Sequence, residues 1–477
     1  MEYKEITTEV FKHYPAYTPD TVREAYSRAI KTLSKKIIVL DDDPTGVQTV
    51  HDIYVYTDWS TQSIRQGFLD APPMFFILTN SRGLTKVQTA ALHCEIAENI
   101  AAVSKELGRE FILISRGDST LRGHYPLETE VLRQTMEESS GLRIDGEILF
   151  PFFPEGGRYT VGDVHYVADG ERLTPAGETE FAKDRTFGYQ SSDLKSWIAE
   201  KSEGVFPAKQ VVSITLEELR AQAYPAIMAK LMGIQGFGKA IVNAISYEDV
   251  MVFATALIGC LNKGKNFIFR TAAAFTKVIG NVSDQPLLTR EQLVNTKNKN
   301  GGIIVVGSHV NKTTQQLERL KADRNIRFVE FNQHLVLDDA RFSEELSRVI
   351  SEAEGSIAAG NTVAVYTRRD RFDLNTGSKE AELEIAVKIS DAVTGIVASL
   401  NIRPNFIIAK GGITSSDIGT KALGVKRAKV MGQILAGVPV WLTGEESKFP
   451  GLPYVIFPGN VGSENALLDA VEKMRVM

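Results

Sequence analysis

The stretch "KKIIVLDDDPTGVQTV", Lys35 to Val50, contains the pattern that decides the fold. Four apolar residues at 37–40 predict a short buried strand, and three aspartates followed by Pro-Thr-Gly come directly after it. Carboxylates cannot remain unpaired in a core, so this strand must end at an edge of a sheet where charge is solvated or used. One aspartate would be explained as a helix N-cap, but three are more than capping requires.

A short apolar run followed by a longer helical pattern recurs along the chain. Such runs stand at 75–78, 111–115, 240–245, 266–270, 302–307, 326–331, 362–367 and 405–410. Strands that alternate with helices predict parallel sheets with helices on both faces. We therefore expect an α/β fold with two domains, each a mainly parallel sheet flanked by helices.

Two segments interrupt this alternation. Residues 151–190 are rich in glycine and turn residues, and "VHYVADGERL" within them predicts a hairpin closed by the Asp-Gly pair at 169–170. Residues 281–300 show no apolar periodicity and end in a polar, Asn- and Lys-rich run, which predicts a linker. We therefore expect an N-terminal domain over residues 1–295 and a C-terminal domain over residues 300–477.

The composition narrows the class of protein. Of the 477 residues 43% are hydrophobic and 24% charged, and the net charge is -5, which does not favour binding to nucleic acid or to an anionic membrane. The amino-terminal segment lacks the apolar core of a signal peptide, and no apolar run approaches the roughly 18 residues of a membrane span. We expect a cytoplasmic protein without nucleic-acid or membrane partners, and a homo-oligomer remains an open alternative to a monomer.

Polar side chains also follow two other predicted strands. Arg82 follows one of them, and the other is followed within seven residues by Arg116, Asp118, Ser119 and Arg122. Ligands of open parallel sheets bind outside the carboxyl ends of the strands. Guanidinium groups bind carboxylates, and a carboxylate among small hydroxyls suits a polyol. Each arginine alone would be explained as a solvated surface charge, but together the three strand ends predict a site for a small, hydroxylated, anionic molecule.

Glycine-rich turns follow three strands of the second half. The stretches "VVGSHVNKTT", "IIAKGGITSSDIG" and "IFPGNVG" supply Gly307, Ser308, Gly411, Gly412, Thr414, Gly459 and Gly462. A strand, a glycine-rich turn and a helix N-terminus together form a cradle of backbone N–H groups for an anion, and we expect Thr414 to cap its helix. Glycines make such turns in any case, but three in one domain predict a bound polyphosphate. The chain contains neither a P-loop nor a GxGxxG sequence after a strand.

These motifs resemble those of the four-carbon acid sugar kinase family. The family's DDxTG motif corresponds to residues 42–46, its DSTLRG motif to 118–123, and its Pro-rich GR segment to "PFFPEGGRYTVG", which contains Arg158. In the second half, GGxTS corresponds to 411–415 and a PGNxG-like terminus to 458–462. The motifs occur in the family's order.

The resemblance implies a two-domain, ATP-dependent kinase that phosphorylates a hydroxyl of a small sugar acid, either a four-carbon acid or a branched five-carbon oxo acid. The N-terminal domain would bind the acid and the C-terminal domain would bind ATP with Mg²⁺, whose protein ligands the sequence does not show. Asp42 or Asp43 would be the catalytic carboxylate. The acid would be bound by Arg82, Arg116, Asp118, Ser119, Arg122 and Arg158, and the nucleotide by Gly307, Ser308, Gly411, Gly412, Thr414, Gly459 and Gly462.

Two features depart from the family pattern and leave the substrate open. His-Tyr-Pro at 124–126 stands where tetronate-specific members have smaller residues, and the segment at 177–201 is longer than in compact members. Two other classes of protein also remain open. A Mg²⁺-dependent aldolase or dehydratase of sugar acids would leave the three glycine-rich turns unexplained, and a sugar-acid sensor would bind the acid without turning over ATP.

Overall fold

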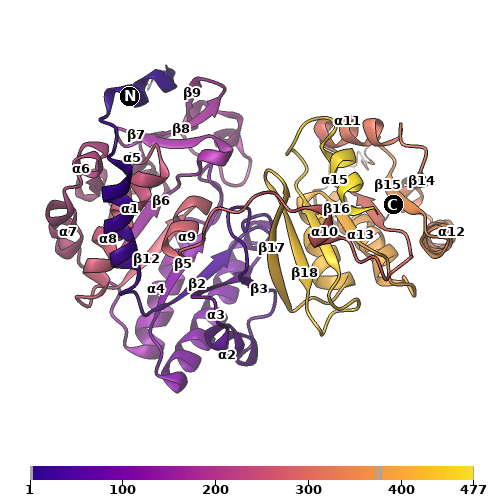
Figure 1. The fold of residues 1–477 in the computed structure, drawn as a ribbon, viewed down its shortest axis with the longest axis horizontal. Coiled ribbons are helices and arrows are strands. Elements are labelled where there is room, and N and C mark those ends of the chain that lie inside the picture. Colours follow the sequence, from indigo (N-terminus) through magenta and orange to yellow (C-terminus); the bar gives the residue numbers. More distant parts are fainter. Residues whose placement is uncertain (1–3, 371, 373, 375–378, 476–477) are drawn as a thin grey trace. The chain divides into compact units, whose positions relative to one another are not determined.

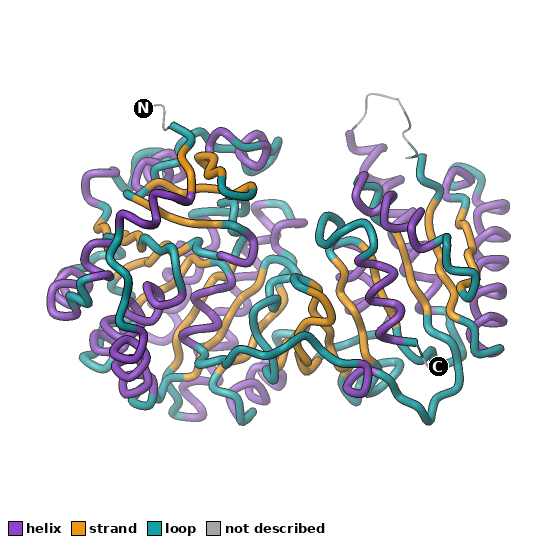
Figure 2. Tube along the Cα trace, turned by 45° about the horizontal axis from the view of Figure 1, so that its top comes forward, coloured by secondary structure: helices purple, strands orange, loops and turns teal. Residues whose placement is uncertain are grey.

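The structure, a computed structural model, describes residues 4–370, 372, 374 and 379–475. It divides into two compact units: the first comprises Met1–Val50 and Asp58–Ser283, and the second comprises His51–Thr57 and Asp284–Met477. In each unit a layer of strands lies between helices (Figure 2). The expected α/β class with mainly parallel sheets is thereby confirmed.

The main sheet of the first unit is parallel, in the strand order β10-β11-β6-β12-β5-β2-β4. These strands are β2 (Lys36–Asp41), β4 (Met74–Leu78), β5 (Phe111–Arg116), β6 (Gly146–Phe150), β10 (Val212–Ile214), β11 (Gly238–Val242) and β12 (Phe267–Thr271). Figure 1 labels β2, β5, β6 and β12 of this sheet. The chain leaves β2 first toward β4 and then returns to its other side at β5, so the strand order reverses at β2. Ligands of open α/β sheets bind at such a reversal.

The register of these strands brings the predicted polar residues to one edge. Residues 37–40 of β2 are fully buried, as their apolar run requires. Asp41, the last residue of β2, lies opposite Arg116 of β5 and Leu78 of β4. Arg116 in turn lies opposite Thr271 of β12. The carboxyl ends of four neighbouring strands therefore meet where the acidic run leaves the sheet.

The helices of the first unit form two groups. In one group α3 packs against α2 and α4, and in the other α8 packs against α1, α6, α7 and α9. Their bounds are α1 (Pro19–Ile30), α2 (Thr61–Leu69), α3 (Lys86–Leu107), α4 (Leu127–Ser140), α5 (Leu194–Lys201), α6 (Leu216–Arg220), α7 (Tyr224–Gly233), α8 (Tyr247–Leu261) and α9 (Ala273–Ile279). The long α3 begins at a capping box of Thr85 and Gln88 and ends at Gly108, which adopts the left-handed conformation.

A small antiparallel sheet forms the excursion from the main sheet. Its order is β1-β9-β8-β7, with β1 (Ile6–Thr7), β7 (Arg158–Val161), β8 (Val164–Asp169) and β9 (Arg172–Pro175). Asp169 pairs with Arg172 across the turn that begins at Gly170, so the predicted hairpin is confirmed.

The sheet of the second unit is mixed, in the order β3-β17-β18-β19-β16-β13-β15-β14. Its parallel part comprises β13 (Ile303–Val306), β14 (Ile326–Phe331), β15 (Thr362–Thr367), β16 (Ile407–Lys410) and β19 (Pro453–Phe457), and its antiparallel part comprises β3 (Tyr54–Tyr56), β17 (Arg427–Leu435) and β18 (Val438–Thr443). The helices are α10 (Arg290–Leu293), α11 (Asn311–Leu320), α12 (Asp339–Ala358), α13 (Lys379–Ala398), α14 (Gly412–Asp417) and α15 (Ala466–Met474).

The division into units differs in two places from the boundary that the sequence suggested. Residues from 284 onward belong to the second unit, and Leu288 and Leu293 pack in its core although they stand in the segment expected to be a linker. The short strand β3 at 54–56 also belongs to the second unit, because it pairs with β17. Neither segment has a periodic pattern of apolar residues, so neither could be assigned to the second unit from the sequence.

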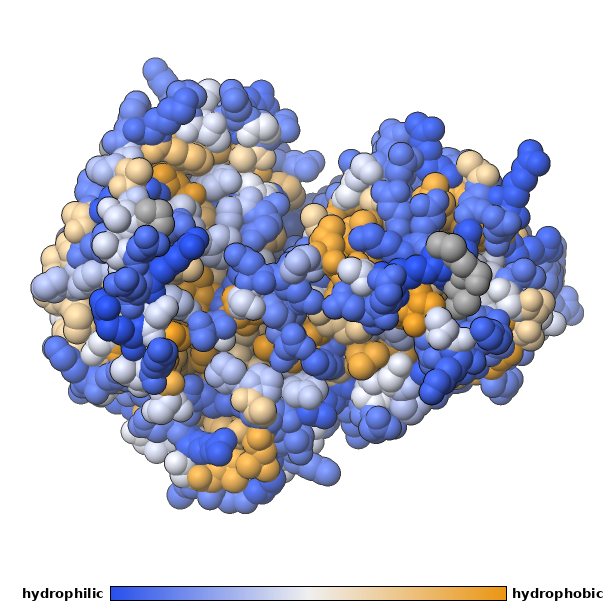
Figure 3. All heavy atoms as spheres, viewed as in Figure 1, coloured by the Kyte–Doolittle hydropathy of each residue, from blue (hydrophilic) through white to orange (hydrophobic). Residues whose placement is uncertain are grey.

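Polar and charged residues cover most of the molecular face in Figure 3, with smaller apolar areas between them. Among the described residues, no helix is both long enough and apolar enough to cross a membrane.

Candidate active site

The first of the three aspartates, Asp41, is part of the sheet edge itself. Its carboxylate lies 3.2 Å from Arg116 Nη1 and accepts a hydrogen bond from the backbone N–H of Asp43 at 3.3 Å. Burial raises its pKa to about 7, against the pull of the Arg116 guanidinium. Arg116, expected to bind substrate, is itself buried and turned toward the aspartates. This pair fixes the end of β2 to the end of β5.

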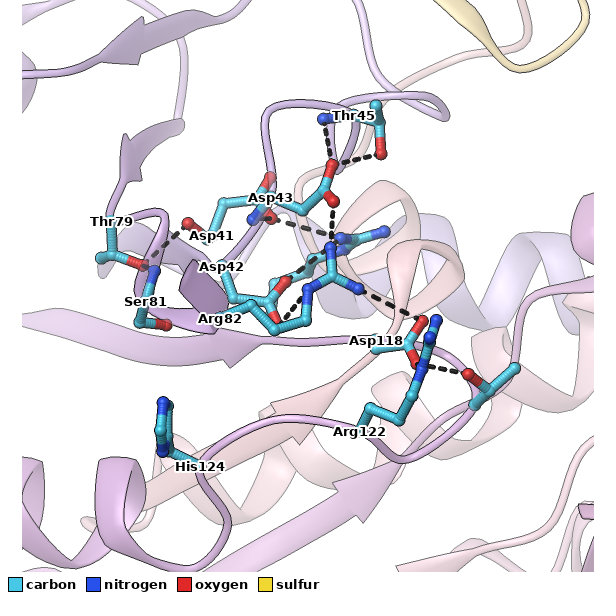
Figure 4. Close-up of polar contacts among 12 residues, drawn as sticks. Asp41, Asp42, Asp43, Thr45, Thr79, Ser81, Arg82, Asp118, Arg122 and His124 are labelled. Atoms are coloured by element: carbon cyan, nitrogen blue, oxygen red, sulfur yellow. Dashed lines mark hydrogen bonds and ion pairs between the residues drawn. The ribbon is translucent and has the colours of Figure 1, made fainter. Parts of the chain in front are cut away.

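Asp43 stabilises the turn that follows the strand. Its carboxylate accepts hydrogen bonds from the backbone N–H of Thr45 at 2.8 Å and from the Thr45 hydroxyl at 2.5 Å, and it is also bonded to Arg82 (Figure 4). Burial opposes ionisation of Asp43, but the Arg82 charge and the Thr45 hydrogen bonds outweigh it and lower the pKa. Asp43 is therefore fully occupied in holding the turn.

Asp42 differs from both of its neighbours. It is buried, with 4% of its surface exposed, and neither carboxylate oxygen has a hydrogen-bond partner among the residues that the structure describes. Arg82 Nε lies 3.7 Å away and Arg116 Nη1 3.8 Å away, which is ion-pair range without a hydrogen bond. Burial raises its pKa, and the guanidinium charges around it oppose that rise. A buried carboxylate with free lone pairs is a group that can accept a proton or a hydrogen bond from a ligand.

Arg82 lies at the centre of the cluster (Figure 4). It comes from the 3-10 turn η2 (Ser81–Gly83) that follows β4. Its guanidinium group reaches Asp42, Asp43 and Asp118, the last at 3.6 Å from Nη1. Although burial disfavours its charge, these carboxylates outweigh the burial and raise the pKa of Arg82. Arg82 therefore stays charged and links two strand ends.

The DSTLRG loop supplies Asp118, Ser119 and Arg122. Arg122 Nε donates to Asp118 Oδ2 at 2.7 Å, and its Nη1 lies 3.8 Å from Asp184. Burial opposes ionisation of Asp118, but Arg82 and Arg122 outweigh it and hold its pKa well below the usual range. Ser119 is buried in the loop beside this pair. His124, just after the loop, lies apart from the cluster in Figure 4 and bonds to the Leu84 carbonyl.

Arg158 differs from the other arginines expected to bind substrate, because it forms no ion pair with a carboxylate among the described residues. Among the described residues no acid lies within ion-pair distance, and its buried Nε has no hydrogen-bond partner. Burial lowers its pKa; the charge of Asp118 opposes that fall, and the charge of Arg122 adds to it. Both guanidinium groups lie over the ring of Phe181, at 5.1 Å from the Arg122 carbon and 5.5 Å from the Arg158 carbon. Two guanidinium groups held over one ring are an arrangement that can bind an anion.

Two further residues hold the DSTLRG loop from behind. His165 on β8 lies 2.8 Å from the Ser119 carbonyl through Nε2 and 3.0 Å from the Thr160 hydroxyl through Nδ1. Burial lowers its pKa to about 4, so it is neutral. The Tyr189 hydroxyl donates to the Thr120 carbonyl at 2.8 Å. The sequence analysis missed both, and only the polar His165 inside an apolar strand pattern could have pointed to the contact.

The turn at Gly46 admits no side chain. A β-carbon there would lie 1.8 Å from Asp41 Oδ2, and the carboxylate cannot move without leaving Arg116 and the Asp43 N–H. We expect Gly46→Ala to lower the free energy of unfolding by about 1–3 kcal/mol, measured by chemical denaturation. Gly233→Ala is the control, since a β-carbon at Gly233 meets no atom within 4 Å. Equal stability of the two variants would contradict this account of the turn.

In the second unit the predicted turns meet at the carboxyl ends of β13, β16 and β19. A β-carbon on Gly307 would lie 2.3 Å from Thr414 Oγ1, and one on Gly411 would lie 3.0 Å from the β-carbon of Ser308. Gly411 has a φ of 127°, which favours glycine. The expectation that Thr414 caps α14 is wrong: Gly411 occupies the N-cap position and Thr414 lies inside the helix. Its hydroxyl packs instead against the turn at Gly307.

The last turn completes this group. A β-carbon on Gly459 would lie 2.9 Å from Ser308 Oγ, whereas one on Gly412 would meet no atom within 4 Å. Gly462 has a φ of 86° and turns the chain toward α15. Gly412 thus faces open space, while Gly307, Gly411 and Gly459 allow the turns to pack together.

Lys410 is the functional candidate that the sequence analysis missed in this unit. Its Nζ donates to the Pro458 carbonyl at 2.5 Å and the Gly459 carbonyl at 3.2 Å. Burial lowers its pKa to about 7, and the neighbouring Lys312 acts in the same direction. The sequence signal for this residue was a lysine directly before the Gly-Gly pair at 411–412. A buried cation beside a glycine-rich turn suits an anionic ligand.

An apolar cavity of about 240 Å³ adjoins these turns. Ile385, Ile389 and Val393 of α13 line it together with Ile413, and Gly307 and Thr414 border it. Ligand pockets combine an apolar wall with a few polar groups in this way. Polar side chains, among them Glu382 and Ser390, complete the lining.

Comparison with known proteins finds one matching family model for each half of the chain. A family model described as a sugar-binding N-terminal domain matches residues 37–279, and one described as a nucleotide-binding C-terminal domain matches residues 303–467. A D-erythronate kinase of Heliobacterium modesticaldum is 24% identical over 376 residues, which are 76% of this chain and 78% of that protein.

Two solved structures have the same fold. A Haemophilus influenzae protein of family DUF1537 is 16% identical with a TM-score of 0.61, over 91% of this chain and 98% of its own. A protein described as a putative tRNA synthase from Salmonella typhimurium LT2 is 15% identical with a TM-score of 0.63, over 92% and 100%. At these identities the likeness concerns the fold alone. The two domain models, which match in order and account for most of the chain, show that it belongs to the four-carbon acid sugar kinase family.

Proposed function

We propose that the protein is an ATP-dependent kinase that phosphorylates a hydroxyl group of a small sugar acid, of four carbons or of five in a branched oxo acid. The observation that carries the proposal is Asp42, a buried carboxylate without a hydrogen-bond partner among the described residues, at the point where the strand order of the sugar-binding unit reverses. The family relationship and the D-erythronate kinase relative support the same reaction class.

Asp42 would act on the acceptor hydroxyl. In phosphoryl transfer the protein chiefly positions the nucleophile and stabilises charge, and a carboxylate accepts the hydroxyl proton. A base is most effective when its pKa approaches the working pH, and burial moves the pKa of Asp42 in that direction. Asp43 is bonded to Thr45 and Arg82, so we assign it to the turn and Asp42 to the chemistry.

Arg158, together with Arg122, would bind the carboxylate of the sugar acid. Arg122 is paired with Asp118, whereas Arg158 has no carboxylate within ion-pair distance and a buried Nε–H without a hydrogen-bond partner among the described residues. Asp118 would hold Arg122 in place and, with Ser119, face the hydroxyl groups of the substrate. We infer that recognition of a small acid is built from this pair of guanidinium groups.

ATP would bind the second unit. The cavity beside α13 would hold the base, and phosphates would approach the backbone at Gly412, which faces open space at the start of α14. Among the described residues no group of three or more acidic, histidine or cysteine side chains could hold a metal ion. Mg²⁺ bound with ATP would be held mainly by phosphate oxygens and water, where it would neutralise phosphate charge.

A coupled assay of ADP release, run on the full chain with ATP, Mg²⁺ and a panel of four- and five-carbon sugar acids, tests the proposal. Acid-dependent ADP release is the expected result, with D-erythronate the first acid to try. Consumption of an acid without nucleotide would favour an aldolase or dehydratase. Binding of an acid without any ATP turnover would favour a sensor, and either result would overturn the kinase assignment.

The base pocket leads to a prediction about nucleotide affinity. Ile389→Ala removes three carbons from the wall of the cavity, a loss of about 1–2 kcal/mol and a roughly 10-fold rise in the Kd for ADP. Calorimetry on the full chain measures it. Val387→Ala is the control, since Val387 stands on the same helix with 49% of its surface exposed and does not line the cavity. An unchanged Kd in the Ile389 variant would place the base elsewhere.

A further inference from the structure

Arg270, which no motif drew attention to, lies beside the proposed catalytic carboxylate. It is the fourth residue of β12 and is buried, with 4% of its surface exposed. Its Nη1 donates to Glu128 Oε2 at 2.7 Å and to the Ser115 hydroxyl at 3.1 Å, and its Nη2 donates to the Arg122 carbonyl at 3.1 Å. One side chain thus joins β12, β5, α4 and the DSTLRG loop.

The backbone of this loop is shaped around Arg270. A β-carbon on Gly117 would lie 2.1 Å from its guanidinium carbon, and one on Gly123 would lie 2.5 Å from Nη2. The same point on Gly123 is 3.6 Å from Asp42 Oδ2. Arg270 and Asp42 therefore meet over Gly123, inside the roughly 4–6 Å range in which an opposite charge favours ionisation of a carboxyl group.

Glu128 fixes the position of Arg270. It stands on α4, is buried, and besides Arg270 accepts a hydrogen bond from the Ser81 hydroxyl at 2.6 Å. His93 of α3 lies 3.9 Å from the same carboxylate oxygen. Since Ser81 precedes Arg82, Glu128 connects two of the three arginines that face Asp42. Breaking one partner of such a buried pair leaves an uncompensated charge, so the pair acts as a unit.

We propose that Arg270 is a positioning residue that favours the ionised form of Asp42 and holds the DSTLRG loop over it, with Glu128 setting the strength of that effect. This inference rests on the proposed role of Asp42. The charged groups that face Asp42 are Arg82, Arg116 and Arg270, which favour its ionisation, and Glu128, which opposes it. Asp41 and Asp43 precede and follow it on its own strand end.

Substitutions of Arg270 and of Glu128 should shift the acid limb of the kcat–pH profile in opposite directions. Loss of a purely structural contact would not give shifts of opposite sign. Removing the cation in Arg270→Met raises the pKa of Asp42, so the acid limb of the kcat–pH profile moves to higher pH, by about one unit or more. Glu128→Gln removes a negative charge and retains the size of the side chain, so the limb moves to lower pH. Arg270→Lys keeps a cation and restores part of the wild-type profile.

The experiment compares kcat–pH profiles and melting temperatures of these variants in the full chain. Arg220→Met is the matched control, because Arg220 forms a similarly buried pair with Asp249 at 2.8 Å in the same unit and contacts none of the site residues. Its acid limb should coincide with that of wild type. If Arg270→Met unfolds, Arg270→Met/Glu128→Gln, which removes both charges, takes its place and should also move the limb upward.

Asp42→Asn, measured in parallel, distinguishes a failure of the proposed role of Asp42 from a failure of the proposed role of Arg270. Near-normal kcat in Asp42→Asn would overturn the proposed function of that residue. Loss of kcat in Asp42→Asn, with acid limbs in the Arg270 and Glu128 variants that coincide with wild type or move in the same direction, would overturn this inference alone.

Discussion

Asp42→Asn is expected to lower kcat by about 10²–10⁴-fold, the usual contribution of a general base. The substitution removes the carboxylate that has no hydrogen-bond partner among the described residues and leaves its size unchanged. Because Asp42 makes no hydrogen bond that the fold would lose, the melting temperature should stay close to that of wild type. The Kd for ADP should also be unchanged, since the proposed nucleotide site belongs to the other unit.

Asp43→Asn is the control for this result, because it changes the adjacent residue in the same way. The pKa of Asp43 is lowered in the folded protein, so its ionised form stabilises the fold above its ordinary pKa, and that contribution is lost when the charge is removed. We expect a lower melting temperature at pH 7 and a smaller loss of kcat than in Asp42→Asn. Steady-state kinetics and thermal unfolding measure both. If the kinetic losses are reversed between the two variants, Asp43 is the base.

Arg158→Met should raise the KM for the sugar acid by roughly 10–100-fold, because a hydrogen bond to a charged group contributes about 1.5–3 kcal/mol. The KM for ATP should not change. Burial outweighs the attraction of Asp118 and lowers the pKa of Arg158, so removal of this charge should leave the stability of the ligand-free protein unchanged or raise it. Arg158→Lys keeps the charge without the fork and should recover part of the affinity.

Arg172→Met is the matched control for Arg158, since it lies on the same small sheet and forms an exposed pair with Glu5. Its KM for the acid should equal that of wild type. A normal KM in Arg158→Met combined with a fall in melting temperature would assign Arg158 to the fold and leave the carboxylate to Arg122.

The strands that could be predicted from the sequence are those with an uninterrupted apolar run. Residues 37–40 and 303–306 are buried on both faces of a parallel sheet, so every residue of the run is apolar. The antiparallel strand at 427–435 buries only every second residue, and its partner at 438–443 contains a proline. The alternation of the first strand and the proline of the second are weaker evidence than a continuous apolar run, and both strands were missed beside the glycine-rich turns.

For the candidate site, the sequence predicted which residues gather but not what each one does. Three consecutive aspartates look alike in a sequence, and only the hydrogen bonds show that Asp43 is occupied and Asp42 is not. Arg270 was missed because an arginine at the end of "NFIFR" resembles the polar end of any strand. Its partner Glu128 stands on a separate helix, and a contact across 142 positions leaves no local trace.

Strand β3 has a consequence for how the chain is made. Tyr56 and Arg427, which it brings together, stand 371 positions apart, so the strand leaves the ribosome long before its partner β17 exists. Domains usually fold in order of synthesis, but here β3 must wait, while the first unit folds around it, until β17 of the second unit has been made. A gene cut near residue 284 would produce a protein in which β17 has an open edge, a surface prone to aggregation. Separate expression of the halves should therefore require grafting residues 51–57 onto the second.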